Sequence, residues 1–253
     1  MKKFTSFIFG LSLFCCAFAG AGETNVKSQP PTSISVQENE LWQEWDSPEG
    51  LSRLQKSNAK ENFWKLLRFY ESQIRSTYCS VATSVIALNA LSIEAPKSKF
   101  LGKYRMFTQE EFFSENVCAV INQNDVAERG MPLEELTTVL KTFPVEVFKY
   151  EAQYLSHEEI RDLLISALKN PNQCVLALYQ RKELKQEGAG HWSPIAAYEA
   201  ESDSFLILDV ARFKYPPTWV NASAFINSMQ TANIYGQSRG FIILEKEGAV
   251  EAN

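Results

Sequence analysis

The sequence predicts an α+β fold, in which a helical first half packs against an antiparallel sheet formed by the second half. Apolar residues recur at helical spacing before residue 170, as in Val81, Val85 and Leu88. From residue 173 onward the pattern changes to short runs typical of strands, separated by turn residues. Helices that precede the strands, rather than alternating with them, indicate an α+β architecture.

Five helices are expected in the first part of the chain. A nearly all-apolar run marks the second of them, and the hydroxyls of Ser76 and Thr77 are placed to cap it. Pro132 fits the first position of the fourth helix. Ser156 and Glu159 form a capping box at the start of the fifth. The expected helices cover residues 58–72, 78–91, 109–121, 132–142 and 157–169.

Four strands are expected in the second part, and the turn Ala200–Ser204 joins two of them as a hairpin. They cover residues 173–180, 191–199, 204–210 and 239–245. A chain of 253 residues with 45% hydrophobic content can bury one sizeable core or two closely packed lobes.

The N-terminus has the features of a signal peptide. Lys2 and Lys3 form a short basic region, an apolar stretch follows, and Ala17-Phe18-Ala19 matches a cleavage site. The stretch is too short for a stable membrane span. We therefore expect a signal peptide at residues 1–19, a flexible lead at 20–44 and a catalytic domain at 45–253, secreted and retained in the periplasm.

The charge pattern argues against a nucleic-acid partner. The net charge is −5, and no run of Lys and Arg exceeds two residues. Loss of Lys2 and Lys3 with the signal peptide takes the net charge to −7. The sequence contains no CxxC pair and no HExxH motif, so we expect no built-in metal site.

Cys79 is the candidate nucleophile, because it is expected in the first turn of the all-apolar helix. A free thiol has a pKa of about 8.5, and a helix N-terminus or a neighbouring imidazolium lowers that pKa and so favours the reactive thiolate. The alternative is a structural role, since free cysteine is among the most buried residue types.

His191 and Asp209 are the candidate partners of Cys79. His191 follows the glycine-rich turn Gly188-Ala189-Gly190, and Asp209 ends an apolar strand. The order thiol, imidazole, acid, with spacings of about 110 and about 20 residues, is that of papain-type cysteine nucleophiles. Asp209 has an alternative role as a turn former, but a buried acid requires a partner. We expect a cleft where the helical half meets the sheet.

The remaining cysteines and histidine have structural interpretations. Cys118 and Cys174 lie in apolar segments and are expected in the core, either free or paired with each other. His157 falls inside the capping box and is expected to be a solvated first-turn residue. An odd number of cysteines in the secreted part of the chain leaves at least one thiol free, as Cys79 requires.

Several segments resemble the phytochelatin synthase family across residues 45–245. They are Tyr78-Cys79 with Leu88-Asn89-Ala90-Leu91, Gly190-His191-Trp192-Ser193-Pro194-Ile195, the unusual stretch Leu208-Asp209-Val210-Ala211-Arg212-Phe213-Lys214-Tyr215-Pro216-Pro217-Thr218-Trp219, and Arg239-Gly240-Phe241. The resemblance implies a papain-like fold. It also implies cleavage of the Cys–Gly bond of glutathione (γ-Glu-Cys-Gly), with release of glycine. The γ-Glu-Cys acyl-enzyme then passes its acyl group to water or to a second glutathione, which is the reaction of phytochelatin synthesis and heavy-metal detoxification.

The resemblance also implies roles for individual residues. Cys79 would be the nucleophile, His191 the general base and acid, and Asp209 the orienting carboxylate. Gln73 would complete the oxyanion hole with the backbone N–H of Cys79; otherwise it is a solvated residue after a helix.

Two arginines match basic positions of the family. Arg181 and Arg239 would bind substrate carboxylates, and the alternative for both is an ordinary surface arginine. Ser80 stands where the family usually has glycine, a departure that affects entry to the helix rather than the catalytic groups.

The resemblance is to the short prokaryotic-type members, because the cysteine-rich C-terminal region of plant-type members has no counterpart here. Hydrolysis of glutathione is expected to dominate in such members. We expect no tightly bound cofactor, with cadmium or zinc entering as a metal–glutathione thiolate, and a homodimer is compatible with the sequence. Two alternatives stay open: a papain-like peptidase of broader specificity, and a secreted thiol- or metal-binding module without catalysis.

Overall fold

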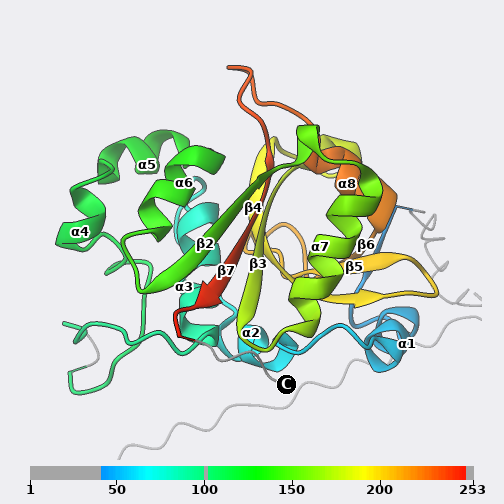
Figure 1. Cartoon of the computed structure of the whole chain (residues 1–253), viewed down its shortest axis with the longest axis horizontal. Coiled ribbons are helices and arrows are strands. Elements are labelled where there is room, and N and C mark those ends of the chain that lie inside the picture. Colours follow the sequence, from blue (N-terminus) through cyan, green and yellow to red (C-terminus); the bar gives the residue numbers. More distant parts are fainter. Residues whose placement is uncertain (1–40, 100–101, 249–253) are drawn as a thin grey trace, which may run out of the picture. The chain divides into compact units, whose positions relative to one another are not determined.

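A seven-stranded antiparallel sheet is the centre of the computed structural model, which describes residues 41–99 and 102–248 (Figure 1). The strand order is β1-β6-β5-β4-β3-β7-β2, and every neighbouring pair is antiparallel. The strands are β1 (Trp42–Glu44), β2 (Val145–Glu151), β3 (Gln173–Gln180), β4 (Gly190–Glu199), β5 (Ser204–Ile207), β6 (Thr218–Asn221) and β7 (Gly240–Lys246).

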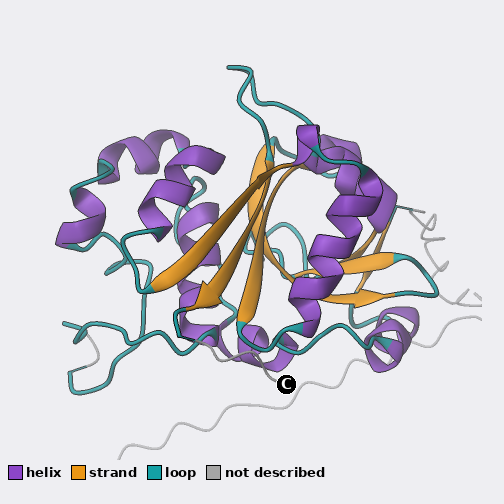
Figure 2. Ribbon diagram, viewed as in Figure 1, coloured by secondary structure: helices purple, strands orange, loops and turns teal. Residues whose placement is uncertain are grey.

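Helices cover both faces of this sheet (Figure 2). Helix α3 packs on one face against β4 and β3, and α7 and α8 pack on the other. The α-helices of the described residues are α1 (Pro48–Lys56), α2 (Phe63–Phe69), α3 (Cys79–Ala90), α4 (Glu115–Cys118), α5 (Gln123–Arg129), α6 (Leu133–Leu140), α7 (His157–Lys169) and α8 (Ala222–Met229). Two 3₁₀ turns, η1 (Ala152–Tyr154) and η2 (Arg181–Leu184), follow β2 and β3.

Strand β3 shows why the central strands are apolar on both sides. Leu176 and Leu178 point into the core on the α3 face, whereas Val175, Ala177 and Tyr179 point into the core under α7 and α8. Successive side chains of a strand face opposite sides of the sheet, so a strand covered on both sides needs an unbroken apolar run. The run at 173–180 therefore marks the middle of the sheet.

Helix α3 is buried nearly all round, with only Cys79 and Asn89 partly exposed. A helix without a polar face belongs inside the protein, and α3 packs against both the sheet and α2. Its N-cap is Tyr78, whose side chain makes no capping hydrogen bond. The capping expected of Ser76 and Thr77 is wrong: the Thr77 hydroxyl donates to the Ala127 carbonyl instead (2.9 Å).

The α+β prediction, with the helix of Cys79 packed on an antiparallel sheet, is confirmed. Helix α7 and strand β3 have the predicted bounds, and the capping box of Ser156 and Glu159 is present. Helix α6 begins one residue after Pro132, which is its N-cap rather than its first residue.

Several other elements are shorter than predicted. The helix expected at 58–72 is only α2 (Phe63–Phe69), and the one expected at 109–121 shortens to α4 (Glu115–Cys118). Ser114 explains the second difference, because its side chain caps the helix by accepting from the Val117 N–H (3.4 Å). Strand β5 ends at Ile207, before the predicted position 210.

The predicted lead at 20–44 needs correction at its end, because Trp42–Glu44 form β1 and pair with β6. The rest of the lead and the signal peptide predicted at 1–19 lie outside the described residues. Within residues 41–99 and 102–248, no helix is long and apolar enough to cross a membrane.

Candidate active site

Cys79 lies at the first position of α3 and lines a cavity of about 790 Å³. The sulfur is therefore placed where the partial positive charge of the helix N-terminus acts. Gly190 and Trp192 of β4 also contribute to the cavity wall, together with Met131 and Pro132 before α6. The residue is partly exposed, as a nucleophile requires.

His191 joins Cys79 to Asp209. Its Nε2 lies 2.9 Å from Oδ1 of Asp209, and its ring is also hydrogen-bonded to the Cys79 sulfur. Because Nε2 is hydrogen-bonded to Asp209, Nδ1 is the ring nitrogen left to contact the Cys79 sulfur. The three predicted residues therefore form one connected set, each held by a different part of the fold.

The electrostatics favour a charged pair at this site. Burial raises the pKa of Cys79, but the hydrogen bond and charge of His191 and the backbone hydrogen bonds of Trp192 and Ser80 together outweigh burial, so the pKa lies below its ordinary value. Burial lowers the pKa of His191, but Asp209 and Cys79 raise it by more. A lowered thiol pKa beside a raised imidazole pKa means that each group stabilises the charged form of the other, a thiolate next to an imidazolium.

Asp209 is buried just after β5, and its carboxylate is held by several donors. Oδ1 accepts from the Arg181 guanidinium (2.8 Å) and from the backbone N–H of Ala211 (2.8 Å), in addition to His191. Tyr70 donates its hydroxyl to the backbone carbonyl of Asp209. Burial raises the pKa of Asp209, but His191, Arg181 and the backbone N–H of Ala211 together outweigh burial and lower the pKa, so the acid stays ionised.

Arg181 has a different contact from the one expected for it. It is 3% exposed and does not line the cavity; its guanidinium pairs with Asp209 Oδ2 at 2.7 Å and donates to Gln186 Oε1 at 2.9 Å. Its planar head also lies over the ring of Tyr215, 5.0 Å from the centroid. The guanidinium of Arg181 therefore contacts Asp209, Gln186 and Tyr215, and the substrate-binding role expected for it stays a prediction.

Gln73 lies in the loop between α2 and α3 and is buried, so it is not the solvated residue of the alternative interpretation. Its side-chain amide donates to the Arg75 carbonyl (2.7 Å), and its backbone N–H donates to the Val210 carbonyl (2.8 Å). A carboxamide has two N–H donors, so one stays available. The oxyanion role of Gln73 stays a prediction.

Arg239 lines the cavity and is 5% exposed. It donates to the Thr231 hydroxyl (2.9 Å) and to the Ala232 carbonyl, and no carboxylate pairs with it among residues 41–99 and 102–248. Burial lowers its pKa. A side chain at Gly190 would come within 3.2 Å of its Nε, so the glycine next to His191 makes room for the guanidinium. A buried cation without a counter-ion is placed to receive an anion.

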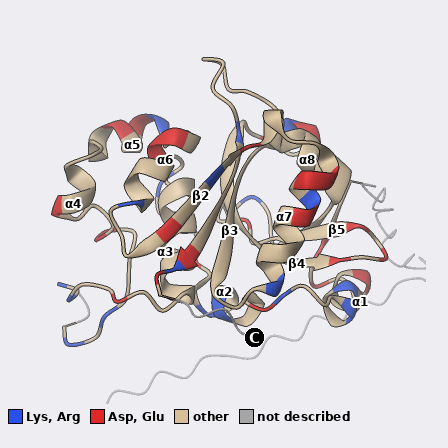
Figure 3. Ribbon diagram, viewed as in Figure 1, with Lys and Arg blue, Asp and Glu red and all other residues tan. Residues whose placement is uncertain are grey.

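Charged residues around the cavity are mostly basic. Among the described residues, Arg129, Lys182 and Arg239 line it with a single carboxylate, Glu135, which Arg129 binds through two hydrogen bonds of 2.8 and 2.9 Å. This local excess contrasts with the net charge of −5 for the whole chain. Elsewhere, elements such as β2 and α7 carry both acidic and basic residues (Figure 3).

The other cysteines and histidine differ in how well they were predicted. Cys174 is buried as expected, and burial raises the pKa of its thiol to about 12. Cys118 is exposed rather than in the core, because α4 is a single turn that leaves its sulfur outside. All three thiols are free in the described residues. His157 has partners rather than being merely solvated: its Nε2 contacts Asn227 Oδ1 (2.9 Å) and Gln230 Oε1 (3.1 Å).

Comparison with known proteins identifies the family to which the chain belongs. The family model described as phytochelatin synthase matches residues 36–241. The chain belongs to the phytochelatin synthase family. Within residues 41–99 and 102–248, no group of three or more His, Cys, Asp or Glu side chains is arranged to hold a metal ion.

Curated relatives of this phytochelatin synthase family member carry the name glutathione gamma-glutamylcysteinyltransferase. The chain is 34% identical to enzyme 3 of Lotus japonicus over 187 residues, which is 74% of the chain and 38% of the relative. It is 31% identical to enzyme 1 of Arabidopsis thaliana, a match that covers 74% of the chain and 37% of the relative. It is 30% identical to the glutathione gamma-glutamylcysteinyltransferase of Schizosaccharomyces pombe, a match that covers 73% of the chain and 44% of the relative. The chain thus matches less than half the length of these relatives.

Among solved structures, the chain is similar to a mutant form of a prointerpain A fragment from Prevotella intermedia. The sequence identity is 10% and the TM-score is 0.39, with 78% of this chain and 75% of the other covered.

Proposed function

We propose that this protein cleaves the Cys–Gly bond of glutathione and passes the γ-Glu-Cys group to water or to a second glutathione. The observation that carries the proposal is the connected set Cys79–His191–Asp209 at the wall of a cavity with a net positive lining. The names of the curated relatives support glutathione as the substrate.

In the first half-reaction, the Cys79 thiolate attacks the carbonyl carbon of the Cys–Gly bond. The oxyanion that forms would be stabilised by the N–H of Cys79 at the start of α3 and by the free N–H of Gln73. The protonated His191 then gives its proton to the nitrogen of the leaving glycine. The C–N bond breaks, and a thioester to Cys79 remains.

In the second half-reaction, His191 takes a proton from the incoming nucleophile. Water gives hydrolysis and free γ-Glu-Cys; the α-amine of a second glutathione gives a longer chain. The new bond forms at the thioester carbon while the C–S bond breaks, and Cys79 returns to its thiolate beside the imidazolium. No further reactant is needed.

Charge complementarity favours a small anionic peptide over a general protein substrate. Glutathione carries two carboxylates and one ammonium group, and the cavity offers the guanidinium of Arg239 without a carboxylate partner in the described residues. A guanidinium binds a carboxylate through two N–H donors. Arg239 is therefore proposed to bind a substrate carboxylate.

Metal ions are proposed to act only as part of the substrate, and the N-terminus is proposed to determine where the protein is located. Cadmium or zinc would arrive as a metal–glutathione thiolate, because no resident metal site is proposed. The signal peptide at 1–19 would place the reaction in the periplasm.

Glycine release from glutathione tests the proposal. The purified protein is expected to release glycine, and Cys79→Ala is expected to abolish release, because the thioester cannot form. Cys118→Ala is the matched control, since it removes an exposed thiol away from the cavity and is expected to leave release unchanged. Absence of glycine, equal loss in both variants, or equally fast cleavage of unrelated peptides would contradict the proposal; the last result would indicate a broader peptidase.

A further inference from the structure

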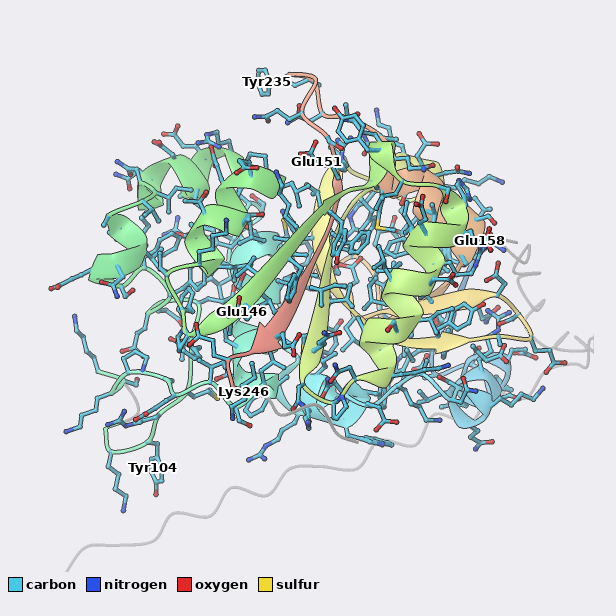
Figure 4. All side chains as sticks on the ribbon, in the orientation of Figure 1. Tyr104, Glu146, Glu151, Glu158, Tyr235 and Lys246 are labelled. Carbon is cyan, nitrogen blue, oxygen red and sulfur yellow. The ribbon has the colours of Figure 1, made fainter. Side chains whose placement is uncertain are left out.

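A short hairpin at the mouth of the cavity has no role in the steps above. It spans residues 232–238 between α8 and β7, closed by the bridge between Ala232 and Ser238. At its tip, Ile234 and Tyr235 are 91% and 79% exposed, yet both line the same cavity as Cys79. Figure 4 shows Tyr235 at the end of this projecting loop.

The tip has an ordered turn despite its exposure. The Asn233 side-chain oxygen accepts from the backbone N–H groups of Tyr235 (2.9 Å) and Gln237 (3.0 Å). The turn needs a residue with positive φ, and Gly236 provides it with a φ of 76°. The turn therefore holds two large apolar side chains in water, where they contribute nothing to the core.

The base of the hairpin is tied to the active site through Arg239. The Arg239 guanidinium donates to the Thr231 hydroxyl (2.9 Å), and its backbone N–H donates to the Thr231 carbonyl (3.0 Å). The residue that is proposed to bind a substrate carboxylate thus also anchors the hairpin. The apolar tip is continuous with the catalytic cavity rather than a separate surface.

Basic side chains accompany the apolar tip at the cavity wall. Arg129 and Lys182 line it together with Ile234 and Tyr235. An apolar surface beside cations is complementary to a small peptide that carries a thiol side chain and carboxylates.

We propose that Ile234 and Tyr235 form the subsite for the acyl acceptor, a second molecule of glutathione or its metal thiolate. The inference rests on the proposed function. Once the γ-Glu-Cys group is attached to Cys79, the inner end of the cavity is occupied, so the acceptor must approach past the hairpin. Its α-amine forms the new C–N bond at the thioester carbon as the C–S bond breaks, and the proton that the amine loses passes to His191.

The experiment compares Ile234→Ser/Tyr235→Ser with Tyr104→Ser. Tyr104 is 67% exposed and lies on a separate loop outside the cavity (Figure 4), so its replacement controls for loss of a surface tyrosine. Each protein is mixed with glutathione, with and without cadmium. The glycine burst of the first turnover, free γ-Glu-Cys and the dimer (γ-Glu-Cys)₂-Gly are measured over a range of glutathione concentrations.

For Ile234→Ser/Tyr235→Ser we expect the glutathione concentration for half-maximal dimer formation to rise about tenfold, because small-molecule sites are lined mainly by apolar and aromatic side chains, and both are replaced here. The glycine burst should fall by much less, and Tyr104→Ser should resemble the unchanged protein. A dimer-to-hydrolysis ratio that is the same in all three proteins would overturn the inference. A glycine burst from the unchanged protein without dimer at any concentration would also overturn it. Absence of glycine from the unchanged protein would instead refute the proposed function itself.

Discussion

Asp209 has three donors on one carboxylate oxygen, and they explain how a buried acid stays charged beside His191. The sequence indicated His191 as its partner, because an acid in an apolar strand needs one. It did not indicate Arg181, since that contact depends on how β3, β4 and the segment after β5 align across the sheet. The Ala211 contact was visible in principle, because aspartate often accepts from the backbone N–H two residues ahead.

The ion pair of Arg181 and Asp209 gives a prediction for stability. Arg181→Met leaves a buried carboxylate with one charged partner fewer, so the free energy of unfolding should fall by about 3–5 kcal/mol. Arg161→Met is the matched control, because it breaks a more exposed pair with Asp203 and should cost less than about 1 kcal/mol. Urea unfolding measures both free energies, and equal losses would contradict a stabilising buried ion pair between Arg181 and Asp209.

The pH dependence of this loss has a definite sign. The folded pKa of Asp209 lies below its ordinary value, so the carboxylate contributes stability at neutral pH that is lost as the pH falls through the folded pKa. Removing Arg181 raises the folded pKa toward the unfolded one. Acid unfolding of Arg181→Met, followed by circular dichroism, should therefore begin at a higher pH than in the unchanged protein.

At the scale of elements, α3 shows what a sequence pattern can and cannot predict. Its apolar run predicted a buried helix with Cys79 in the first turn, and both are found. The capping by Ser76 and Thr77 was wrong because the Thr77 hydroxyl meets Ala127, a partner 50 residues away. Contacts of this kind depend on packing that no local pattern contains.

Elements that were not predicted also depend on contacts with distant parts of the chain, although some have a recognisable local sequence pattern. Helix α8 begins after Asn221, whose side chain accepts from the Ala224 N–H (3.1 Å), an ordinary capping pattern. Strand β1 is three residues long and pairs with β6, which lies far away in the sequence. Short edge strands are defined by their partner, so the predicted lead extended too far.

Packing of α3 gives a prediction for the core. Leu88 is fully buried between α3 and its neighbours, so Leu88→Ala should lower the free energy of unfolding by about 2–5 kcal/mol through lost burial and a cavity. Leu51→Ala removes the same atoms from a residue of α1 that is 44% exposed, and should cost about 0.5 kcal/mol or less. If urea unfolding shows similar losses of unfolding free energy for Leu88→Ala and Leu51→Ala, α3 is not a core element.

For the whole molecule, the sheet brings together groups that are far apart in sequence. Cys79 comes from the helix on one face, His191 from β4, and Asp209 from the segment after β5 (Figure 1). The residue types could be predicted because nucleophilic catalysis requires a thiol, an imidazole and an acid in reach of one another. The basic cavity wall could not be predicted, since Arg129 ends α5, Lys182 lies in η2 and Arg239 precedes β7, and only the fold brings them to one cavity.

In the proposed mechanism, Cys79 is a thiolate paired with a protonated His191. Alkylation by iodoacetamide, followed at Cys79 by peptide mass spectrometry across the pH range, tests it most directly because only the thiolate reacts. His157→Ala serves as the control for His191→Ala, since His157 contacts Asn227 and Gln230 rather than the catalytic thiol.

In the unchanged protein and in His157→Ala, Cys79 is expected to react at lower pH values than a free cysteine, because His191 lowers its pKa. In His191→Ala the reaction should move to higher pH. If Cys79 instead reacts with the pH dependence of a free cysteine in all three proteins, the thiolate–imidazolium pair does not exist and the account is wrong.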